Sequence, residues 1–179
     1  MKQQPSEASA RIFRTPLGWA GVAASDAGIT RVILPKADRK SVERELKRVE
    51  CRAASGKGVK GRSELLNQAV NLLERFFAGE DVLFDLPLDL RYYTPFQQRV
   101  WNTCAAIPYG KTRSYQWIAE RIKRPKAARA VGQAMGANPV PVVVPCHRVV
   151  TAAGRLGGFS GGLGLKKKLL GLEERKSGR

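Results

Sequence analysis

Cys146 and His147 stand next to each other, and His147 is the only histidine among the 179 residues. A thiolate is a strong nucleophile, but a free cysteine has a pKa near ~8.5, so only a few per cent is ionised at neutral pH. A neighbouring base, or cations such as Arg148 and Arg129, would raise that fraction. The pair therefore indicates a nucleophilic thiol. The alternative is a cysteine that only fills the core, since cysteine is among the most buried residue types.

The local pattern argues against direct proton transfer between these two side chains. The run 142–144, three valines, is typical of a buried strand that leads into Pro145. Adjacent side chains of a strand point to opposite faces, so we expect His147 to act through a bend in the backbone or a bridging water. A carboxylate should orient its imidazole, as in catalytic triads. The candidates are Glu173 and Glu174, on a C-terminal helix expected to begin near Leu165.

The other cysteines do not suggest a metal site or a disulfide framework. The chain has three cysteines and one histidine, and no two cysteines form a Cys-x-x-Cys pair. A tetrahedral zinc site would need nearly all of them. We therefore expect no metal, no cofactor and at least one free thiol. Cys104 is expected to be buried in a helix, and Cys51 has no expected role.

The charge of the chain points to a polyanionic partner. Lys and Arg total 32 against 15 Asp and Glu, which gives a net charge of +17. Such an excess costs self-repulsion in the folded state, although basic residues can also serve only solubility. DNA, RNA and an anionic membrane all remain open as partners on this ground. No segment approaches the ~20 apolar residues of a membrane span, and residues 1–10 lack the apolar core of a signal peptide, so an intracellular protein is expected.

The first half of the sequence predicts a small sheet with two helices. Three strands are expected at 10–14, 17–24 and 29–34, with a turn at 26–28. A basic segment, 36–62, should hold a helix over about 41–53 and a glycine-rich loop over 55–61. Ser63 is expected to cap a second helix that ends at Gly79 and buries apolar residues at helical spacing. The run 84–90 contains Pro87 and is typical of an edge strand or linker, which places a domain boundary near 86–93.

The second half predicts helices with sharp starts. Thr94, Pro95 and Gln97 form a capping box with proline in the first turn, and the helix that follows should bury Phe96, Val100 and Trp101. Ser114 should cap a short helix, and Pro125 should begin another that is rich in alanine and glycine. Two short helices joined by a tight turn suggest a helix-turn-helix, surrounded here by basic residues. Such pairs are common in ordinary globular proteins, and it is the charge that favours DNA binding.

Pro145-Cys146-His147-Arg148-Val149 resembles the active-site signature of the O6-alkylguanine-DNA alkyltransferases, also called methylated-DNA–protein-cysteine methyltransferases. The resemblance covers about 84–173 closely and the N-terminal half loosely. The other matching segments follow the family's order and spacing: Thr94–Trp101, Ile107–Thr112, Ser114-Tyr115, Ala128–Gly132, Asn138-Pro139 and Gly161–Leu163, with Thr15–Gly18 and Pro87-Leu88 in the first half.

The resemblance implies DNA repair by stoichiometric, irreversible transfer of an alkyl group from O6 of guanine to Cys146, without a cofactor. Activity on O4 of thymine stays open. The implied partner is double-stranded DNA containing O6-alkylguanine, bound by a monomer with its damaged nucleotide flipped out of the duplex. His147 would be a water-mediated base, Glu173 would hold the imidazole, and Asn138 would stabilise the bend before the active site.

The same resemblance implies a set of substrate contacts. Tyr115 would donate to the guanine ring, Ser160 would donate toward O6, and the carbonyls of Cys146 and Val149 would accept from the exocyclic amine. Arg129 would fill the gap left by the flipped nucleotide. Phe159 stands where the family often has tyrosine, so only ring packing on the base is expected there. With a single histidine, the structural zinc site of some family members cannot be built.

Together these inferences give an α/β (α+β) fold. A small N-terminal sheet-plus-helix domain of structural role, residues 1–88, would precede a mostly helical domain, residues 89–179. The second domain would carry a winged-helix-like helix-turn-helix, bind DNA and hold the acceptor cysteine. Two alternatives fit the sequence less well. Alkyltransferase-like proteins flag damage without chemistry, but they lack the cysteine that is present here as Cys146. A cysteine hydrolase would explain neither the charge nor the helix pair.

Overall fold

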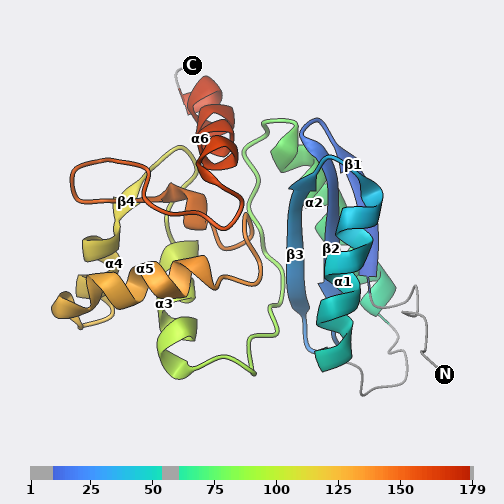
Figure 1. The fold of residues 1–179 in the computed structure, drawn as a ribbon, viewed down its shortest axis with the longest axis horizontal. Helices are drawn as coiled ribbons and strands as arrows, with labels where there is room; N and C mark the ends of the chain where they lie inside the picture. Colours follow the sequence, from blue (N-terminus) through green and yellow to red (C-terminus); the bar gives the residue numbers. More distant parts are fainter. Residues whose placement is uncertain (1–9, 54–60, 178–179) are drawn as a thin grey trace. The chain divides into compact units, whose positions relative to one another are not determined.

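The computed structural model describes residues 10–53 and 61–177, which fall into two compact units (Figure 1). The first unit runs to Ala78 and takes in Val82–Asp89, and the second holds Gly79–Asp81 and the chain from Leu90 onward. The described elements confirm the α+β class, with a small antiparallel sheet followed by helices. No helix in the described part of the chain is long and apolar enough to cross a membrane.

The sheet of the first unit is an antiparallel meander. Its strands are β1 (Ala10–Thr15), β2 (Gly18–Ala24) and β3 (Ile29–Lys36), in that order. All three expected strands are confirmed, and β3 runs two residues further than expected. The predicted turn closes with a hydrogen bond of 2.9 Å from the Ser25 N–H to the Gly28 carbonyl.

The sheet carries one helix on each face, α1 (Arg39–Ala53) and α2 (Arg62–Phe77) (Figure 1). Val42 and Leu46 of α1 pack on Ala23 and Ile33 of the sheet. Gly21 permits this close approach, because a Cβ there would lie 2.8 Å from Cγ1 of Val42. The opposite helix, α2, buries five residues: Leu66, Ala69, Leu73, Phe76 and Phe77.

Two expectations for α2 were wrong at its ends. Gly61, not Ser63, is the residue that precedes the helix, and its φ of 106° lies in the left-handed region that suits glycine. Its carbonyl accepts the first helical hydrogen bond, 2.9 Å from the N–H of Leu65. Ser63 is therefore already inside the helix. At the other end, α2 stops at Phe77 rather than at Gly79.

The edge strand expected over 84–90 is reduced to a single parallel bridge between Ile29 and Leu88. The N–H of Ile29 donates to the carbonyl of Pro87 at 2.8 Å, and the N–H of Asp89 donates to the carbonyl of Ile29 at 2.9 Å. Proline has no N–H to extend the ladder, which accounts for the short pairing. Asp89 is held further by the Ser25 hydroxyl, which donates to its carboxylate at 2.6 Å.

The second unit begins with α3 (Pro95–Ala105), and its predicted start is confirmed in detail. Thr94 accepts from the Gln97 N–H, and the Gln97 side chain accepts from the Thr94 N–H, so the capping box is closed. Val100 and Trp101 are buried, whereas Phe96 is only half-buried. The indole N–H of Trp101 donates to the carbonyl of Ala134 at 2.9 Å, which joins α3 to α5.

The helix pair consists of α4 (Tyr115–Arg121) and α5 (Ala128–Gly136). Ser114 caps α4, as predicted, by accepting from the N–H of Trp117 at 3.0 Å. The second helix differs from expectation, because Pro125 begins a separate 3-10 turn, η1 (Pro125–Ala127), before α5 starts. Lys123, with a φ of 58°, lies in the sharp connection between the helices.

The buried strand expected at 142–144 was wrong. These residues form turns with one isolated bridge between Pro141 and Val144, and Val142 has a φ of 78°. Prolines 139, 141 and 145 lack the N–H groups that a ladder needs, so a regular strand cannot form. The short elements that follow are η2 (Cys146–Arg148), β5 (Val149–Val150), which pairs in parallel with β4 (Arg113–Ser114), and the helix α6 (Leu163–Ser177).

Candidate active site

His147 and Glu173 form a buried hydrogen-bonded pair within the second unit. Nε2 of His147 lies 2.7 Å from Oε1 of Glu173, and the side chains are 0% and 1% exposed. His147 comes from the 3-10 turn η2, and Glu173 comes from α6. The residue pattern left Glu173 and Glu174 open, and the family resemblance implied Glu173. The structure places Glu173 against the imidazole, while Glu174 is exposed.

Glu173 is also held by a cation and by the backbone. Its Oε1 and Oε2 accept from Nε of Arg148 at 3.0 and 3.1 Å, and Oε2 accepts from the N–H of Gly110 at 2.9 Å. Arg148 in turn donates to the carbonyl of Ile107 at 2.6 Å. Burial alone would raise the pKa of Glu173, but the hydrogen bonds from His147 and Arg148 outweigh it, and the pKa is lowered. The carboxylate is therefore ionised at neutral pH.

The electrostatics of His147 suit a base. Burial lowers the pKa of His147, against the opposing effect of Glu173, so the imidazole is neutral at pH 7. Because the ionised Glu173 can only accept a hydrogen bond, Nε2 of the neutral ring carries the proton and donates it to the carboxylate. The lone pair that can accept a proton is then on Nδ1. The ring is thus both oriented and uncharged, as a proton acceptor must be.

The Cys146 thiol is deeply placed, with 3% of the residue exposed. It begins η2, and its N–H donates to the carbonyl of Val144 at 2.7 Å. Burial raises the pKa of Cys146 to about 11, while a hydrogen bond with Asn138 and the charge of Lys166 act to lower it. A thiol with this pKa is protonated at neutral pH. Any nucleophilic role therefore needs a base that removes the proton during the reaction.

Asn138 ties together the bend that leads to Cys146. Its Nδ2 donates to the carbonyl of Val144 at 2.9 Å, and its Oδ1 accepts from the N–H of Val140 at 3.0 Å. These bonds span the turns that replace the expected strand. The predicted bend is therefore present, with Asn138 holding both of its arms.

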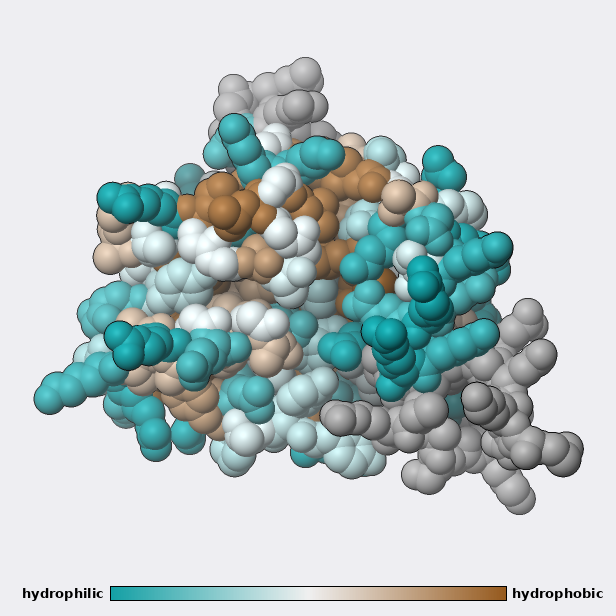
Figure 2. All heavy atoms as spheres, viewed as in Figure 1, coloured by the Kyte–Doolittle hydropathy of each residue, from teal (hydrophilic) through white to brown (hydrophobic). Residues whose placement is uncertain are grey.

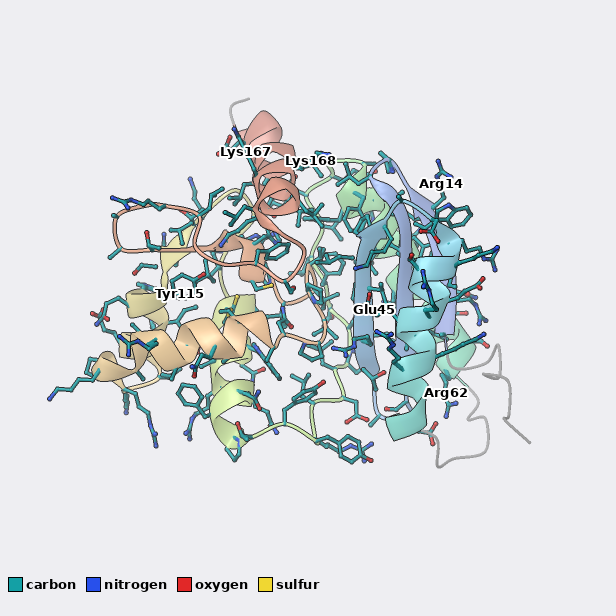
Figure 3. All side chains as sticks on the ribbon, viewed as in Figure 1. Arg14, Glu45, Arg62, Tyr115, Lys167 and Lys168 are labelled. Carbon is teal, nitrogen blue, oxygen red and sulfur yellow. The ribbon has the colours of Figure 1, made fainter. Side chains whose placement is uncertain are left out.

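Tyr115 lies at the start of α4 and meets residues 157–162, which contain four glycines and are called the glycine-rich loop from here on (Figure 3). Its hydroxyl donates to the carbonyl of Gly158 at 3.4 Å. Gly157 has a φ of 62°, and a Cβ there would lie 2.7 Å from the Tyr115 hydroxyl. The loop thus approaches the ring at a position that only glycine fills without a clash.

Lys166 is a component of the site that the sequence did not suggest. The residue is 0% exposed, and its Nζ donates to the carbonyl of Val149 at 2.6 Å and to the carbonyl of Leu156. Burial lowers the pKa of Lys166. It joins the segment after Cys146 to the glycine-rich loop. A lysine in a basic helix is normally a surface residue, and no pattern in the sequence sets this one apart.

The remaining expected residues lie nearer the surface. Arg129 and Ser160 are exposed and Phe159 is half-buried, and none of the contacts described above joins them to the buried cluster. Val149, in contrast, is fully buried, with its carbonyl bound to Lys166. Cys104 is buried in α3, as expected. The side chain of Cys51 lies outside the described residues.

The helix pair presents a basic surface. Arg113 and Arg121 both stack on the ring of Trp117, at 5.5 and 4.8 Å from its centroid. The cations exposed on and around α4 and α5 are Lys111, Arg113, Arg121, Lys123, Arg124, Lys126 and Arg129. The only exposed acid within this stretch is Glu120.

Comparison with known proteins identifies the family. A family model described as "6-O-methylguanine DNA methyltransferase, DNA binding domain" matches residues 95–175, and one described as "6-O-methylguanine DNA methyltransferase, ribonuclease-like domain" matches residues 10–90. The chain therefore belongs to the O6-alkylguanine-DNA alkyltransferase family, as its resemblance predicted.

The relatives and solved structures agree with this assignment. Methylated-DNA–protein-cysteine methyltransferase of Mycolicibacterium paratuberculosis is 57% identical over 109 residues, which are 61% of this chain and 66% of that protein. The protein of the same name from Methanosarcina acetivorans is 41% identical over 162 residues, 90% of this chain and 96% of that one. A crystal structure of Mycobacterium tuberculosis OGT in complex with DNA is 40% identical with a TM-score of 0.72, and covers 93% of this chain and 92% of that one.

Proposed function

We propose that this protein repairs DNA by moving an alkyl group from O6 of guanine to the sulfur of Cys146, once per molecule. The observation that carries the proposal is the buried pair of His147 and Glu173, which adjoins a thiol that is protonated at rest. The relatives named methylated-DNA–protein-cysteine methyltransferase support the same reaction.

In the proposed reaction the thiol loses its proton as the sulfur attacks. A bridging water carries the proton from Cys146 to Nδ1 of neutral His147, and Glu173 stabilises the imidazolium that forms. The new S–C bond replaces the C–O6 bond, and the electron pair of that bond stays on the guanine. The guanine then takes up a proton, so the thiol proton is in effect exchanged for the alkyl group. The thioether has no easy leaving group, and the protein is consumed.

The depth of the thiol requires the base to leave the duplex. The sulfur of a cysteine that is only 3% exposed cannot reach a base that remains stacked in a helix. Extrusion of a nucleotide requires a few kcal/mol, and less for a mispaired base. Arg129, exposed on α5, would enter the stack to offset part of that cost. The basic surface around α4 and α5 would bind phosphates without sequence preference, which suits a search along any DNA.

The contacts to the extruded guanine that the family resemblance implies complete the proposal. Tyr115 would donate to the ring as the departing base gains electron density, and Ser160 would donate toward O6. The carbonyls of Cys146 and Val149 would accept from the exocyclic amine, and Phe159 would pack its ring on the base. Activity on O4 of thymine remains outside the proposal.

We extend the proposal to the two parts of the chain. Residues 1–88 would be structural, and residues 89–179 would bind DNA and accept the alkyl group; the division into compact units and the two family matches support this. The protein would act as a monomer and inside the cell, where its DNA substrate is found.

Mass spectrometry tests the reaction. After incubation with duplex DNA containing O6-methylguanine, we expect one added methyl group per chain, on the peptide that contains Cys146. Cys146→Ala should gain nothing, and Cys104→Ala should be labelled normally on Cys146. Several methyl groups repaired per chain, or label on Cys51 or Cys104, would contradict single-use transfer to Cys146. Turnover of a thioester would instead support a cysteine hydrolase.

A further inference from the structure

The outer side of α1 carries a row of cations that the proposed reaction does not use. The row consists of Lys40, Arg44, Lys47 and Arg48, all exposed. Residues separated by three, four, seven or eight positions share one face of a helix, so these four side chains form a continuous stripe. Figure 2 shows hydrophilic side chains gathered over α1 on this face of the unit. We call these four residues the α1 stripe.

The α1 stripe points away from the core, and the neighbouring acids are engaged beside it. Val42 and Leu46, on the other side of the helix, are buried against the sheet. Glu43 pairs with Arg39 at 3.0 Å, and Glu45 pairs with Lys36 at 3.2 Å on the flank nearest β3 (Figure 3). Over 39–48, where the side chains of this helix are described, both acids therefore pair with cations outside the stripe.

The start of the helix does not neutralise the stripe either. Asp38 accepts from the N–H and the hydroxyl of Ser41, each at 2.8 Å, and so caps the first turn. The charge of Arg44 contributes to the lowered pKa of Asp38, but the hydrogen bonds to Ser41 contribute more. Glu43, three residues after Lys40 and four before Lys47, borders the stripe, and its carboxylate is paired with Arg39.

We infer that the α1 stripe binds the phosphate backbone of duplex DNA, as a contact separate from that of the helix pair. The choice of DNA among polyanions rests on the proposed function. Like charges four residues apart on a helix destabilise it by about 0.2–0.5 kcal/mol per pair, and a polyanion removes that repulsion. From residue 40 to residue 48 the helix rises about 12 Å. That length faces about three to four phosphates of one strand.

The composition of the stripe favours a nucleic-acid backbone over a membrane surface. A helix that lies on a membrane buries a row of large apolar side chains in the lipid. The apolar residues Val42 and Leu46 of α1 are already buried in the protein, so the exposed side offers only charge. Charge without apolar or base-reading groups gives binding that is independent of sequence and sensitive to salt.

Binding of the full-length protein to undamaged duplex DNA at several salt concentrations tests the inference. The test variant is Arg44→Gln/Arg48→Gln on the stripe. The matched control is Asn67→Glu/Asn71→Glu, which changes the net charge by the same two units at exposed positions of α2, on the other face of the sheet. We expect the slope of log affinity against log salt to fall by about 1.8 in the stripe variant. The control should keep the wild-type slope, and Arg44→Lys/Arg48→Lys should retain it as well.

Equal slopes for the stripe variant and the control would overturn the inference, because net charge alone would then explain the binding. A larger loss on anionic vesicles than on DNA would assign the stripe to a membrane. Alkyl transfer from the free base O6-benzylguanine, which needs no DNA, is measured in parallel and should be equal in all variants. If the wild-type protein transfers nothing from duplex DNA containing O6-methylguanine, the proposed function fails, while the comparison of slopes still decides the stripe.

Discussion

His147 and Glu173 meet at 2.7 Å although 26 positions separate them in the chain, and both are almost completely buried. Arg148 shares the same carboxylate, so one ionised acid serves a neutral imidazole and a guanidinium together. A buried carboxylate with two partners stabilises the fold as long as it stays ionised, and removing one member leaves the other charges uncompensated.

The stability of the protein should therefore fall at acid pH in a way that depends on Glu173. Its pKa is lowered in the folded state, so its contribution is present above the unfolded value of about 4.3 and is lost as pH falls through the folded value. Glu173→Gln should be less stable than wild type at pH 7 by about 3–5 kcal/mol, because Arg148 is left buried and unneutralised. Urea unfolding at pH 7 and below pH 4 measures this. A difference that stays constant with pH would contradict the assignment.

The rate of transfer should depend on pH through the neutral form of His147. Burial lowers the pKa of His147, and the pKa of Cys146 is raised to about 11, so the protonated thiol and neutral imidazole coexist between these two values. Single-turnover rates should be flat from about pH 7 to pH 9 and should fall as His147 becomes protonated at lower pH. In His147→Gln the rate should rise with pH toward 11, since only pre-ionised thiolate can react. A flat profile in that variant would rule out His147 as the base.

Lys166 should be needed for transfer even from a free base. Its removal, as in Lys166→Met, deprives the buried carbonyl of Val149 and the half-buried carbonyl of Leu156 of their donor. The expected loss of stability is about 1–3 kcal/mol. Because Val149 is proposed to bind the exocyclic amine, the second-order rate constant for transfer from O6-benzylguanine should fall about tenfold or more. The control is Lys167→Met, at the exposed neighbouring position on α6. Its free energy of unfolding should be within about 0.5 kcal/mol of the wild-type value. Equal behaviour of the two variants would remove Lys166 from the site.

The glycine-rich loop should tolerate a side chain at Gly158 but not at Gly157, the residue before it. In Gly157→Ala the new Cβ would lie 2.7 Å from the Tyr115 hydroxyl, on a backbone with a φ of 62°. The strain should amount to about 1–2 kcal/mol and should displace Tyr115 from the guanine, with a loss of transfer. Gly158→Ala meets nothing within 4 Å and should be close to wild type. The melting temperatures and transfer rates of the two variants are measured together. If Gly157→Ala has the melting temperature and transfer rate of wild type, the loop can move away from Tyr115 and the prediction is wrong.

Signals within a few residues predicted the elements best. Thr94 with Gln97, and Ser114 with Trp117, are caps whose hydrogen bonds form between neighbours in the chain, and both were confirmed. The expected strand at 142–144 failed because three nearby prolines and the side chain of Asn138 replace the ladder that a valine run suggests. Apolar residues show burial, and in a short run they do not distinguish a strand from a packed loop.

The site was predictable only in part, for a related reason. The adjacency of Cys146 and His147 marked the centre, while the choice of Glu173 over Glu174 depended on which face of α6 meets η2. Lys166 was missed because its burial depends on the carbonyls of Val149 and Leu156, which come from other parts of the chain. Long-range contacts of this kind leave no local pattern in the sequence.

Arg129 provides a test that separates extrusion of the base from the chemistry. Arg129→Ala removes an exposed side chain of α5 and should leave stability and transfer from O6-benzylguanine unchanged. Transfer from duplex O6-methylguanine should slow by about tenfold to a hundredfold, which corresponds to an increase of about 1.4–2.8 kcal/mol in the cost of flipping. Lys126→Ala, at an exposed position of η1, removes an equal charge and should weaken binding only by one phosphate contact. A mispaired or single-stranded substrate needs less energy for extrusion, so the difference in transfer rate between Arg129→Ala and wild type should be smaller on it. If that difference in rate is the same on duplex, single strand and free base, Arg129 does not act on the flipped nucleotide.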